Sequence, residues 1–199
     1  MYEWRKMTPR HRAEIFDLRR QHQSPWHSPP HYSEEGFHYY HLTGACYEHR
    51  PIIGSSPERM AGFETELCEM LGEGRNRLGA WCVLPNHWHA LAWVVDLKET
   101  VSAIGKFHGR TSFLWNQEDE TRGRKCWHRC ADRRIRSDRH FHVARNYIHH
   151  NPVKHGCVEK WEDWPYSSAG NHIAKAGREA VLKQWHEYPI LNMGEGWDD

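Results

Sequence analysis

Two closely spaced histidines are the first residues in this chain whose types and spacing could do chemistry. His87 and His89 flank Trp88 in a stretch that favours a β-strand. Alternate residues of a strand point to the same face, so we expect the two imidazoles to project together, with Trp88 buried on the other face. Two neutral imidazoles placed in this way form part of a site for a divalent ion. Packing or surface histidines are the common alternative.

A tyrosine and an asparagine form the second pair with chemical potential. Tyr147 and Asn151 are four residues apart in a stretch with helical periodicity, so they share one helix face. Asn151 can offer an amide oxygen to a metal. A phenol ordinarily has a pKa of about 10, so a nucleophilic tyrosine needs electrophilic help at the phosphate, which a metal supplies. The alternative is that Asn151 only stops a helix before Pro152 and Tyr147 only packs.

The elements that position these residues follow from hydrophobic periodicity and turn signals. Strands are predicted over 37–47, 77–84, 87–95 and 126–136. Helices are predicted over 8–23, 57–71, 98–116, 137–151 and 178–185. Within the first strand, Tyr39, His41 and Thr43 share one face. The order of elements predicts an α+β domain, in which an antiparallel sheet carries helices on one face.

Length, charge and cysteine content limit the class of protein. The 199 residues suit one domain with extensions, and no apolar run is long enough to span a membrane. The first residues lack an apolar signal core, so we expect an intracellular protein with its six cysteines as free thiols. The net charge is only +1, but residues 105–156 carry 12 Lys and Arg against 5 Asp and Glu. This concentration favours a local anionic partner, and a merely solvated face is the alternative.

Four ordered boxes carry a resemblance to a known family. They are Leu-Pro-Asn-His-Trp-His-Ala at 84–90, Gly-Lys-Phe-His-Gly-Arg-Thr at 105–111, Tyr-Ile-His-His-Asn-Pro-Val-Lys-His-Gly at 147–156 and Trp-Pro-Tyr-Ser-Ser at 164–168. Together they resemble the REP-associated tyrosine transposases, members of the HUH single-tyrosine superfamily. The resemblance covers about 37–168. It implies an N-terminal extension over 1–36, which ends in a Pro-rich linker, and a C-terminal tail over 169–199.

The resemblance carries expectations about fold and chemistry. It implies a ferredoxin-like sheet with the histidine motif on a central strand. His87, His89 and Asn151 match the residues that bind Mg²⁺ or Mn²⁺ in the family. Tyr147 matches the nucleophile that cleaves single-stranded DNA near hairpins of repetitive extragenic palindromes, leaving a 5′-phosphotyrosine link and a free 3′-hydroxyl. The resemblance also implies a bacterial cytoplasmic protein that acts at the nucleoid as a monomer, with no membrane partner.

Five cations in the basic segment are expected to contact the DNA backbone. Lys106 and Arg110 lie on the exposed face of the predicted helix over 98–116, and Arg122, Arg124 and Lys125 lie in the loop that follows. Such contacts position DNA without reading its sequence.

Three other interpretations were weighed. The alternating Cys126, His128 and Cys130 could bind zinc, but their spacing matches no standard finger. A histidine-triad hydrolase is excluded because Leu91 stands where a third alternating histidine is required. A protein that binds DNA hairpins without cleaving them remains open.

Overall fold

The computed structural model describes Thr8, residues 38–191 and Met193. The helix expected over 8–23 and the Pro-rich stretch that follows it, except for Thr8, lie outside the described residues. The division of the chain into extension, domain and tail therefore stays a prediction.

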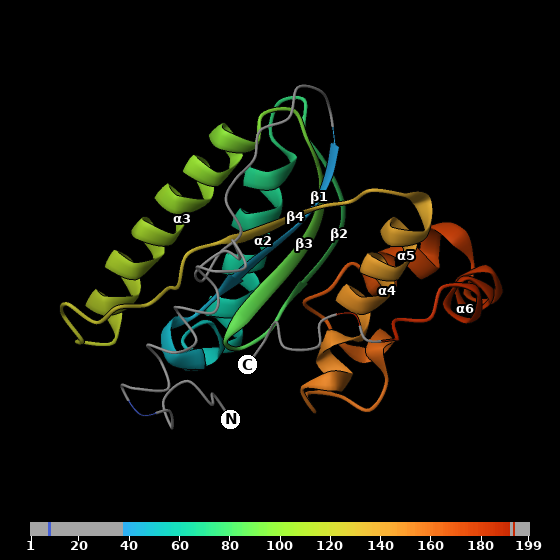
Figure 1. Cartoon of the computed structure of the whole chain (residues 1–199). Helices are drawn as coiled ribbons and strands as arrows, with labels where there is room; N and C mark the ends of the chain where they lie inside the picture. Colours follow the sequence, from blue (N-terminus) through green and yellow to red (C-terminus); the bar gives the residue numbers. More distant parts are fainter. Residues whose placement is uncertain (1–7, 9–37, 192, 194–199) are drawn as a thin grey trace.

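Four strands form one antiparallel sheet (Figure 1). They are β1 (His38–Ala45), β2 (Arg77–Val83), β3 (His87–Val94) and β4 (Ala131–Arg134), in the order β2-β3-β1-β4. β3 pairs with both β1 and β2, which makes it an interior strand. One helix joins β1 to β2 and another joins β3 to β4, so the topology is ferredoxin-like, as expected.

Helices lie on both sides of this sheet. They are α2 (Pro57–Gly72), α3 (Leu97–Glu118), α4 (Asp138–Lys154), α5 (Ala169–Ala176) and α6 (Arg178–Glu187). Short 3₁₀ turns are η2 (Tyr47–His49), η3 (Ile53–Ser55) and η4 (Trp161–Asp163). The prediction that the helices lie on one face is correct only for the two connecting helices, α2 and α3, which cover one face together (Figure 1); it is wrong for α4. α4 covers the other face, because its Ala144 and Ile148 are buried with Ala80 and Leu91 of the sheet. We call this side of the sheet the α4 face.

The three long helices begin where local chemistry dictates. Ser56, Asp96 and Ser137 are the N-caps of α2, α3 and α4, and each side chain accepts a hydrogen bond from the backbone N–H three residues on. Pro57 follows Ser56 at the first helical position, where its missing N–H costs nothing. The Ser137 cap fixes where α4 starts, and the start of the helix decides which of its residues face the sheet.

α5 was not predicted, and of the predicted boundaries the start of β4 and the end of α4 differ most from the structure. Residues 126–130 are not part of β4; they run beside β1 through an isolated bridge between Cys46 and Trp127. α4 does not stop before Pro152 but continues to Lys154. A proline near a helix end removes only one hydrogen bond, and the last turn is closed by the His155 N–H donating to the Asn151 carbonyl. Asn151 is thus a helical residue rather than a helix stop.

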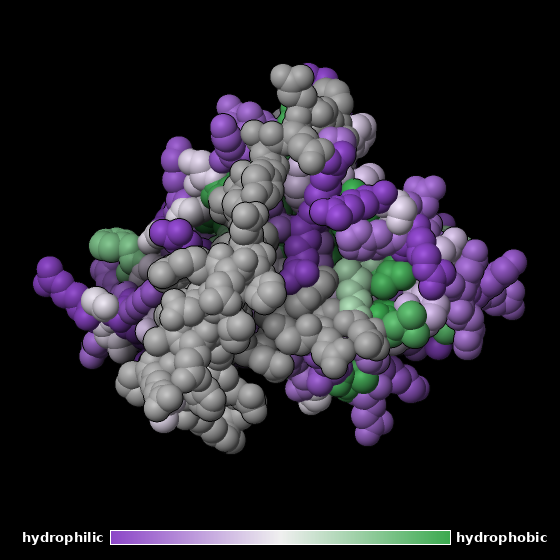
Figure 2. Space-filling view, in the orientation of Figure 1, coloured by the Kyte–Doolittle hydropathy of each residue, from purple (hydrophilic) through white to green (hydrophobic). Residues whose placement is uncertain are grey.

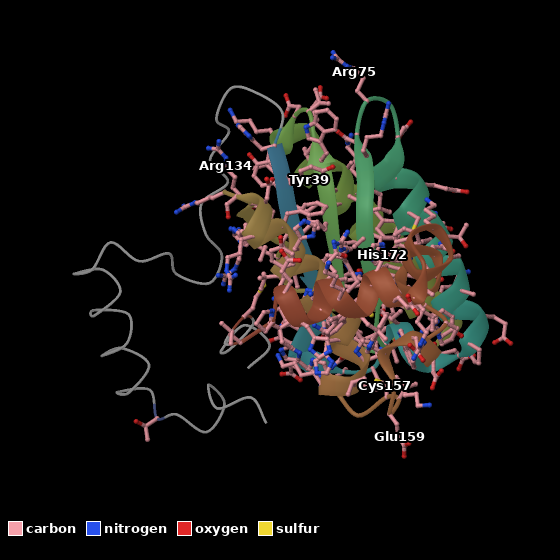
Figure 3. All side chains as sticks on the ribbon, turned by 90° about the vertical axis from the view of Figure 1, so that its right-hand side faces the viewer. Tyr39, Arg75, Arg134, Cys157, Glu159 and His172 are labelled. Carbon is pink, nitrogen blue, oxygen red and sulfur yellow. The ribbon has the colours of Figure 1, made fainter. Side chains whose placement is uncertain are left out.

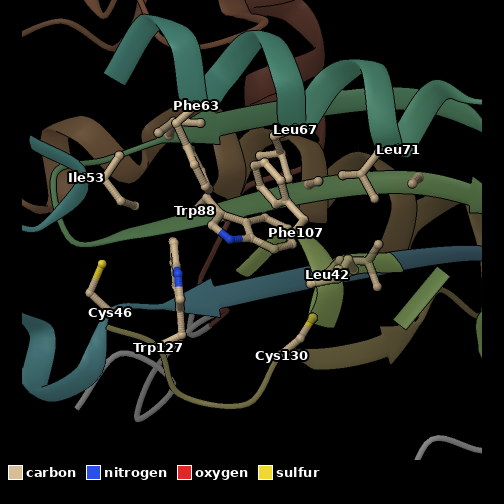
Figure 4. Close-up of a cluster of buried hydrophobic side chains, with 14 of the residues drawn as sticks. Leu42, Cys46, Ile53, Phe63, Leu67, Leu71, Trp88, Phe107, Trp127 and Cys130 are labelled. Carbon is tan, nitrogen blue, oxygen red and sulfur yellow. The ribbon is translucent and has the colours of Figure 1, made fainter. Parts of the chain in front are cut away.

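The larger hydrophobic core lies between the sheet and the pair α2 and α3 (Figure 4). Trp88 is fully buried there and its indole N–H donates to His108 Nε2 at 3.1 Å. The His108 ring in turn stacks on Trp127 with centroids 3.9 Å apart. Trp88 thus occupies the face opposite to its two neighbouring histidines, as strand periodicity predicted.

The close packing of Trp88 and His108 leaves no room for a side chain at Gly44. A Cβ at Gly44 would lie 2.4 Å from the Trp88 indole nitrogen and 2.8 Å from the His108 ring. We expect Gly44→Ala to lower the free energy of unfolding by about 1–3 kcal/mol, the usual cost of overpacking a filled core. Chemical denaturation measures the change. Gly62→Ala is the matched control, since nothing lies near its added Cβ on α2; equal effects of the two substitutions would refute the close packing at Gly44.

Candidate active site

The paired histidines lie at the start of an interior strand. Leu84 and His87 close the turn at Pro85-Asn86, with the Leu84 N–H donating to the His87 carbonyl at 2.8 Å. His87 and His89 then project to the α4 face, with ring centroids 5.0 Å apart. Both are buried, at 2% and 0% exposure. The local prediction of two imidazoles on one face is confirmed.

His87 is held by an amide on each side. Its Nδ1 lies 2.7 Å from Asn86 Oδ1, and the Asn86 amide nitrogen donates to the His49 carbonyl. Because that second bond fixes the orientation of the Asn86 amide, His87 Nδ1 carries a proton. In a neutral ring the lone pair is then on Nε2, which lies 3.1 Å from Asn151 Oδ1. Two acceptor atoms therefore converge at this point.

His89 is oriented by two side chains from β1. The strand register places Thr43 opposite His89, and His41 lies two residues before Thr43 on the same face of β1. His89 Nδ1 lies 2.9 Å from Thr43 Oγ1 and 3.1 Å from His41 Nε2. His41 was not among the expected site residues. The available signal was its shared face with Thr43, but its position beside His89 depends on a register that local periodicity does not reveal.

The expected nucleophile and amide come together with the histidines. Tyr147 lies on α4 with its ring centroid 5.4 Å from His89 and 5.8 Å from His41. Asn151 is one turn further along and contacts His87. Tyr147 is 1% exposed and Asn151 is fully buried. The structure therefore brings the pair His87 and His89 together with the pair Tyr147 and Asn151, although more than 50 residues separate the two pairs in the sequence.

Two cations flank Tyr147. The Lys154 ammonium lies 5.3 Å from the centroid of the Tyr147 ring. Arg133 lies opposite His41 in the β1–β4 register, so its side chain is also on the α4 face. Burial lowers the pKa of the Arg133 guanidinium, while its electrostatic interaction with Tyr147 acts in the opposite direction. Both cations favour negative charge at the tyrosine oxygen or on a phosphate beside it.

The Trp-Pro-Tyr-Ser-Ser box supports α4 from behind. Ser168 donates and accepts backbone hydrogen bonds with Trp81 on β2, and the Trp164 indole donates to the Val83 carbonyl at 2.8 Å. Ser168 Oγ also contacts His149 Nε2 on α4 at 2.9 Å. The box therefore ties α4 to the edge of the sheet and is structural in this fold.

Buried histidines give a prediction for stability against pH. Burial lowers the pKa of His108 to about 3, and burial followed by the charges of His172 and Arg145 lowers that of His149 to about 3. In the unfolded chain both histidines take up a proton near pH 6.5, whereas in the folded chain they do so only near pH 3. Their contribution to the free energy of unfolding is therefore complete above pH 6.5 and is lost as the pH falls toward 3. Each histidine contributes a slope of about 1.4 kcal/mol per pH unit in this window. Urea unfolding at pH 7, 6, 5 and 4 tests it: His149→Gln should give a shallower slope, and a slope equal to that of the unchanged chain would contradict the prediction.

The five cations expected to bind DNA are not brought to Tyr147. Lys106 and Arg110 lie on α3, which covers the opposite face of the sheet (Figure 1). Arg110 pairs with Glu66 of α2 at 2.5 Å. Arg122 is exposed in the following loop. The sequence could not reveal this separation, because residues contiguous in a basic segment are divided between the two sides of the sheet.

Arg124 and Lys125, like Arg110, have contacts within the fold. Arg124 pairs with Asp119 at 2.7 Å and bonds the Asn116 amide oxygen at 3.0 Å. The Arg59 guanidinium first, and then Arg124, holds the pKa of Asp119 at about 2. Lys125 lies 4.3 Å from the centroid of the Tyr47 ring. That these side chains bind DNA stays a prediction.

The zinc interpretation gains no support from the geometry. Cys126 Sγ contacts Asn116, Cys130 Sγ contacts the Ala131 carbonyl, and His128 Nε2 accepts the Glu48 N–H. Across residues 38–191, no group of three or more His, Cys, Asp or Glu side chains is spaced to hold a metal. A metal at His87 and His89 would therefore take its further ligands from an amide such as that of Asn151 or from water. None of the described helices is long and apolar enough to cross a membrane.

Comparisons with known proteins place the chain in a family. A protein of Haemophilus influenzae named as a REP-associated tyrosine transposase is 33% identical over 129 residues, which cover 57% of this chain and 69% of that protein. A REP-associated tyrosine transposase of Escherichia coli is 31% identical over 100 residues, or 49% of this chain and 57% of that protein. No protein-family model matches the chain.

A solved structure extends the likeness to the fold. It is the structure of a REP-associated tyrosine transposase bound to a REP hairpin, with a TM-score of 0.58 and 21% identity, covering 82% of this chain and 88% of that one. The α+β fold with a four-stranded antiparallel sheet is thus shared with this solved structure. This chain belongs to the family of REP-associated tyrosine transposases.

Proposed function

We propose that this chain cleaves and rejoins single-stranded DNA near REP-type hairpins, with Tyr147 as the nucleophile. The observation that carries the proposal is the convergence of Tyr147 with His87, His89 and Asn151 on the α4 face. The relatives' names support the substrate class.

The reaction is a transesterification at one phosphodiester. The Tyr147 oxygen loses its proton and forms a bond to phosphorus, while the bond from phosphorus to the 3′-oxygen breaks and that oxygen takes up a proton. The DNA is left with a free 3′-hydroxyl and a 5′-phosphotyrosine link, and attack by a 3′-hydroxyl reverses the step. Arg133 and Lys154 stabilise negative charge at the tyrosine and at the phosphate.

The residues present fit a divalent cation, Mg²⁺ or Mn²⁺. With a proton on its Nδ1, neutral His87 directs the Nε2 lone pair toward Asn151 Oδ1, and a cation between two such acceptors removes their repulsion. Asn151 Nδ2 has no hydrogen-bond partner among the described residues, so the amide gains nothing else from this orientation. His87, His89 and Asn151 would hold the ion, which would polarise the scissile phosphate.

Hairpin binding without cleavage is the second candidate. The observation in its favour is the 1% exposure of Tyr147, since a phosphate must come within about 3–3.5 Å of the nucleophile to react. A phosphate can therefore reach Tyr147 only if side chains packed around the Tyr147 ring move.

Differential end-labelling of a REP-type hairpin oligonucleotide separates the two candidates. After incubation with Mn²⁺, cleavage predicts that a 3′-end label migrates with the protein, and that the released 5′-labelled fragment is extended by a polymerase. Binding alone predicts that both labels are recovered on intact DNA after denaturation.

A further inference from the structure

Positive charge is divided unequally between the two sides of the sheet. α2 is acidic, with one arginine against four glutamates, which are Glu58, Glu64, Glu66 and Glu69. The segment from β4 to the end of α4 carries six cations against Asp132 and Asp138. They are Arg133, Arg134, Arg136, Arg139, Arg145 and Lys154. Arg134 and Asp132 point to the other side of the sheet, and the rest of this segment is strongly positive. An anionic polymer therefore meets a more favourable field on the Tyr147 side than over α2.

Geometry separates these cations by role. Arg134 lies opposite Tyr40 on the side of the larger core and contacts His38 Nδ1 at 3.3 Å. Arg145 is buried and contacts His142 Nδ1 at 2.7 Å. Arg133 shares the α4 face with His41. Arg145 is thus held within the fold and the half-buried Arg134 lies on the other side of the sheet, while the exposed Arg133 stands beside the reacting tyrosine.

Two further arginines continue from Arg133 away from Tyr147. Arg136 is exposed in the connection after β4, and Arg139 is exposed in the first turn of α4. Figure 3 faces the α4 side and shows Arg134, at the end of β4, far from Cys157, which follows α4. The exposed arginines therefore lie toward the start of α4, and Lys154 lies toward its end. Arg136 and Arg139 thus follow Arg133 on the segment that connects the strand beside Tyr147 to the start of α4.

A surface depression adjoins Arg139. It has a volume of about 380 Å³ and is lined by Ser137, Arg139, His140, Val143, Pro189, Ile190, Leu191 and Met193. Its lining is mostly apolar with a cation at its edge, which suits a base beside a phosphate. Figure 2 shows hydrophobic residues gathered over α4 on a described surface that is otherwise mostly hydrophilic.

We propose that Arg133, Arg136 and Arg139 form the track along which a DNA backbone reaches Tyr147, and that the α3 cations lie off this path. This inference rests on the proposed function and names the surface that delivers its substrate. We call the three residues the arginine track. A single strand on this track would have one phosphate at Tyr147 and the preceding or following phosphates at the arginines.

The salt dependence of binding tests the track. The probe is a fluorescein-labelled REP-type hairpin oligonucleotide with a single-stranded flank, and its anisotropy is read at several salt concentrations in EDTA so that no cleavage intervenes. Each phosphate contact on a single strand contributes about −0.7 to the slope of log affinity against log salt. We expect Arg133→Gln/Arg136→Gln/Arg139→Gln to reduce the magnitude of the slope by about 2. Lys106→Gln/Arg110→Gln, the matched control, should leave it unchanged.

The outcomes are distinguishable from failure of the cleavage proposal. If the triple variant keeps the unchanged slope, or if the α3 variant loses as much, the track is wrong even where covalent cleavage is observed. If the slope falls as expected but no adduct forms with Mn²⁺, the track stands and cleavage is wrong. If thermal unfolding shows the triple variant to be misfolded, the exposed Arg139→Gln alone should reduce the slope by about 0.7, and no reduction would overturn the proposal.

Discussion

Replacing Tyr147 with phenylalanine is expected to abolish the covalent protein–DNA adduct while leaving hairpin affinity within about twofold. Phenylalanine keeps the ring contacts with His41 and His89 but lacks the oxygen that would bond to phosphorus. Loss of an enzyme nucleophile lowers rates by roughly 10⁴- to 10⁶-fold, so no adduct should accumulate. Denaturing gel analysis measures the adduct, and anisotropy measures binding in the same samples.

A control variant keeps this result interpretable. Tyr166→Phe removes a hydroxyl that donates a hydrogen bond to the Pro57 carbonyl of α2 at 3.3 Å, on the other side of the sheet. It should form the adduct at the normal rate. An adduct that persists in Tyr147→Phe would remove Tyr147 from the chemistry.

Truncating either histidine is expected to have the second largest effect. His87→Ala and His89→Ala should each weaken Mn²⁺ affinity by more than about 100-fold and stop cleavage, because each removes an imidazole ligand from a site of three. Asn151→Ala should weaken affinity less, by about tenfold, since a water oxygen can replace an amide oxygen. Titration calorimetry of Mn²⁺ without DNA reads this directly.

His186→Ala supplies the control for this series. His186 is exposed on α6, so its removal deletes an imidazole with no role in the site. Its Mn²⁺ affinity should equal that of the unchanged chain. If both strand-histidine variants also bind Mn²⁺ normally, the metal site lies elsewhere.

The parts of the site that the sequence revealed are those with a local cause. The common face of His87 and His89 follows from strand periodicity, and the common face of Tyr147 and Asn151 follows from helical periodicity. His41 depended on pairing between β1 and β3, across 48 residues from His89, so periodicity alone could not place it beside the site. Local patterns thus predict which residues share a face, and the sheet register decides which faces meet.

The DNA contacts show why the rest could not be predicted. Lys106 and Arg133 belong to one basic segment in the sequence, yet they project from opposite sides of the sheet. Charge counts carry no information about that division. The end of α4 is a second feature that the sequence did not reveal. A stop before Pro152 was predicted, yet α4 continues to Lys154, because a proline is tolerated in the last turn of a helix.

Peptide mapping of the covalent adduct tests the central claim most directly. The unchanged protein is incubated with a REP-type hairpin oligonucleotide and Mn²⁺, digested with nuclease and protease, and analysed by mass spectrometry for a peptide that carries a nucleotide. The account predicts a single modified peptide, with a 5′-phosphate ester on Tyr147. A nucleotide on another tyrosine, such as Tyr39 or Tyr47, or hairpin binding without any modified peptide, would contradict it.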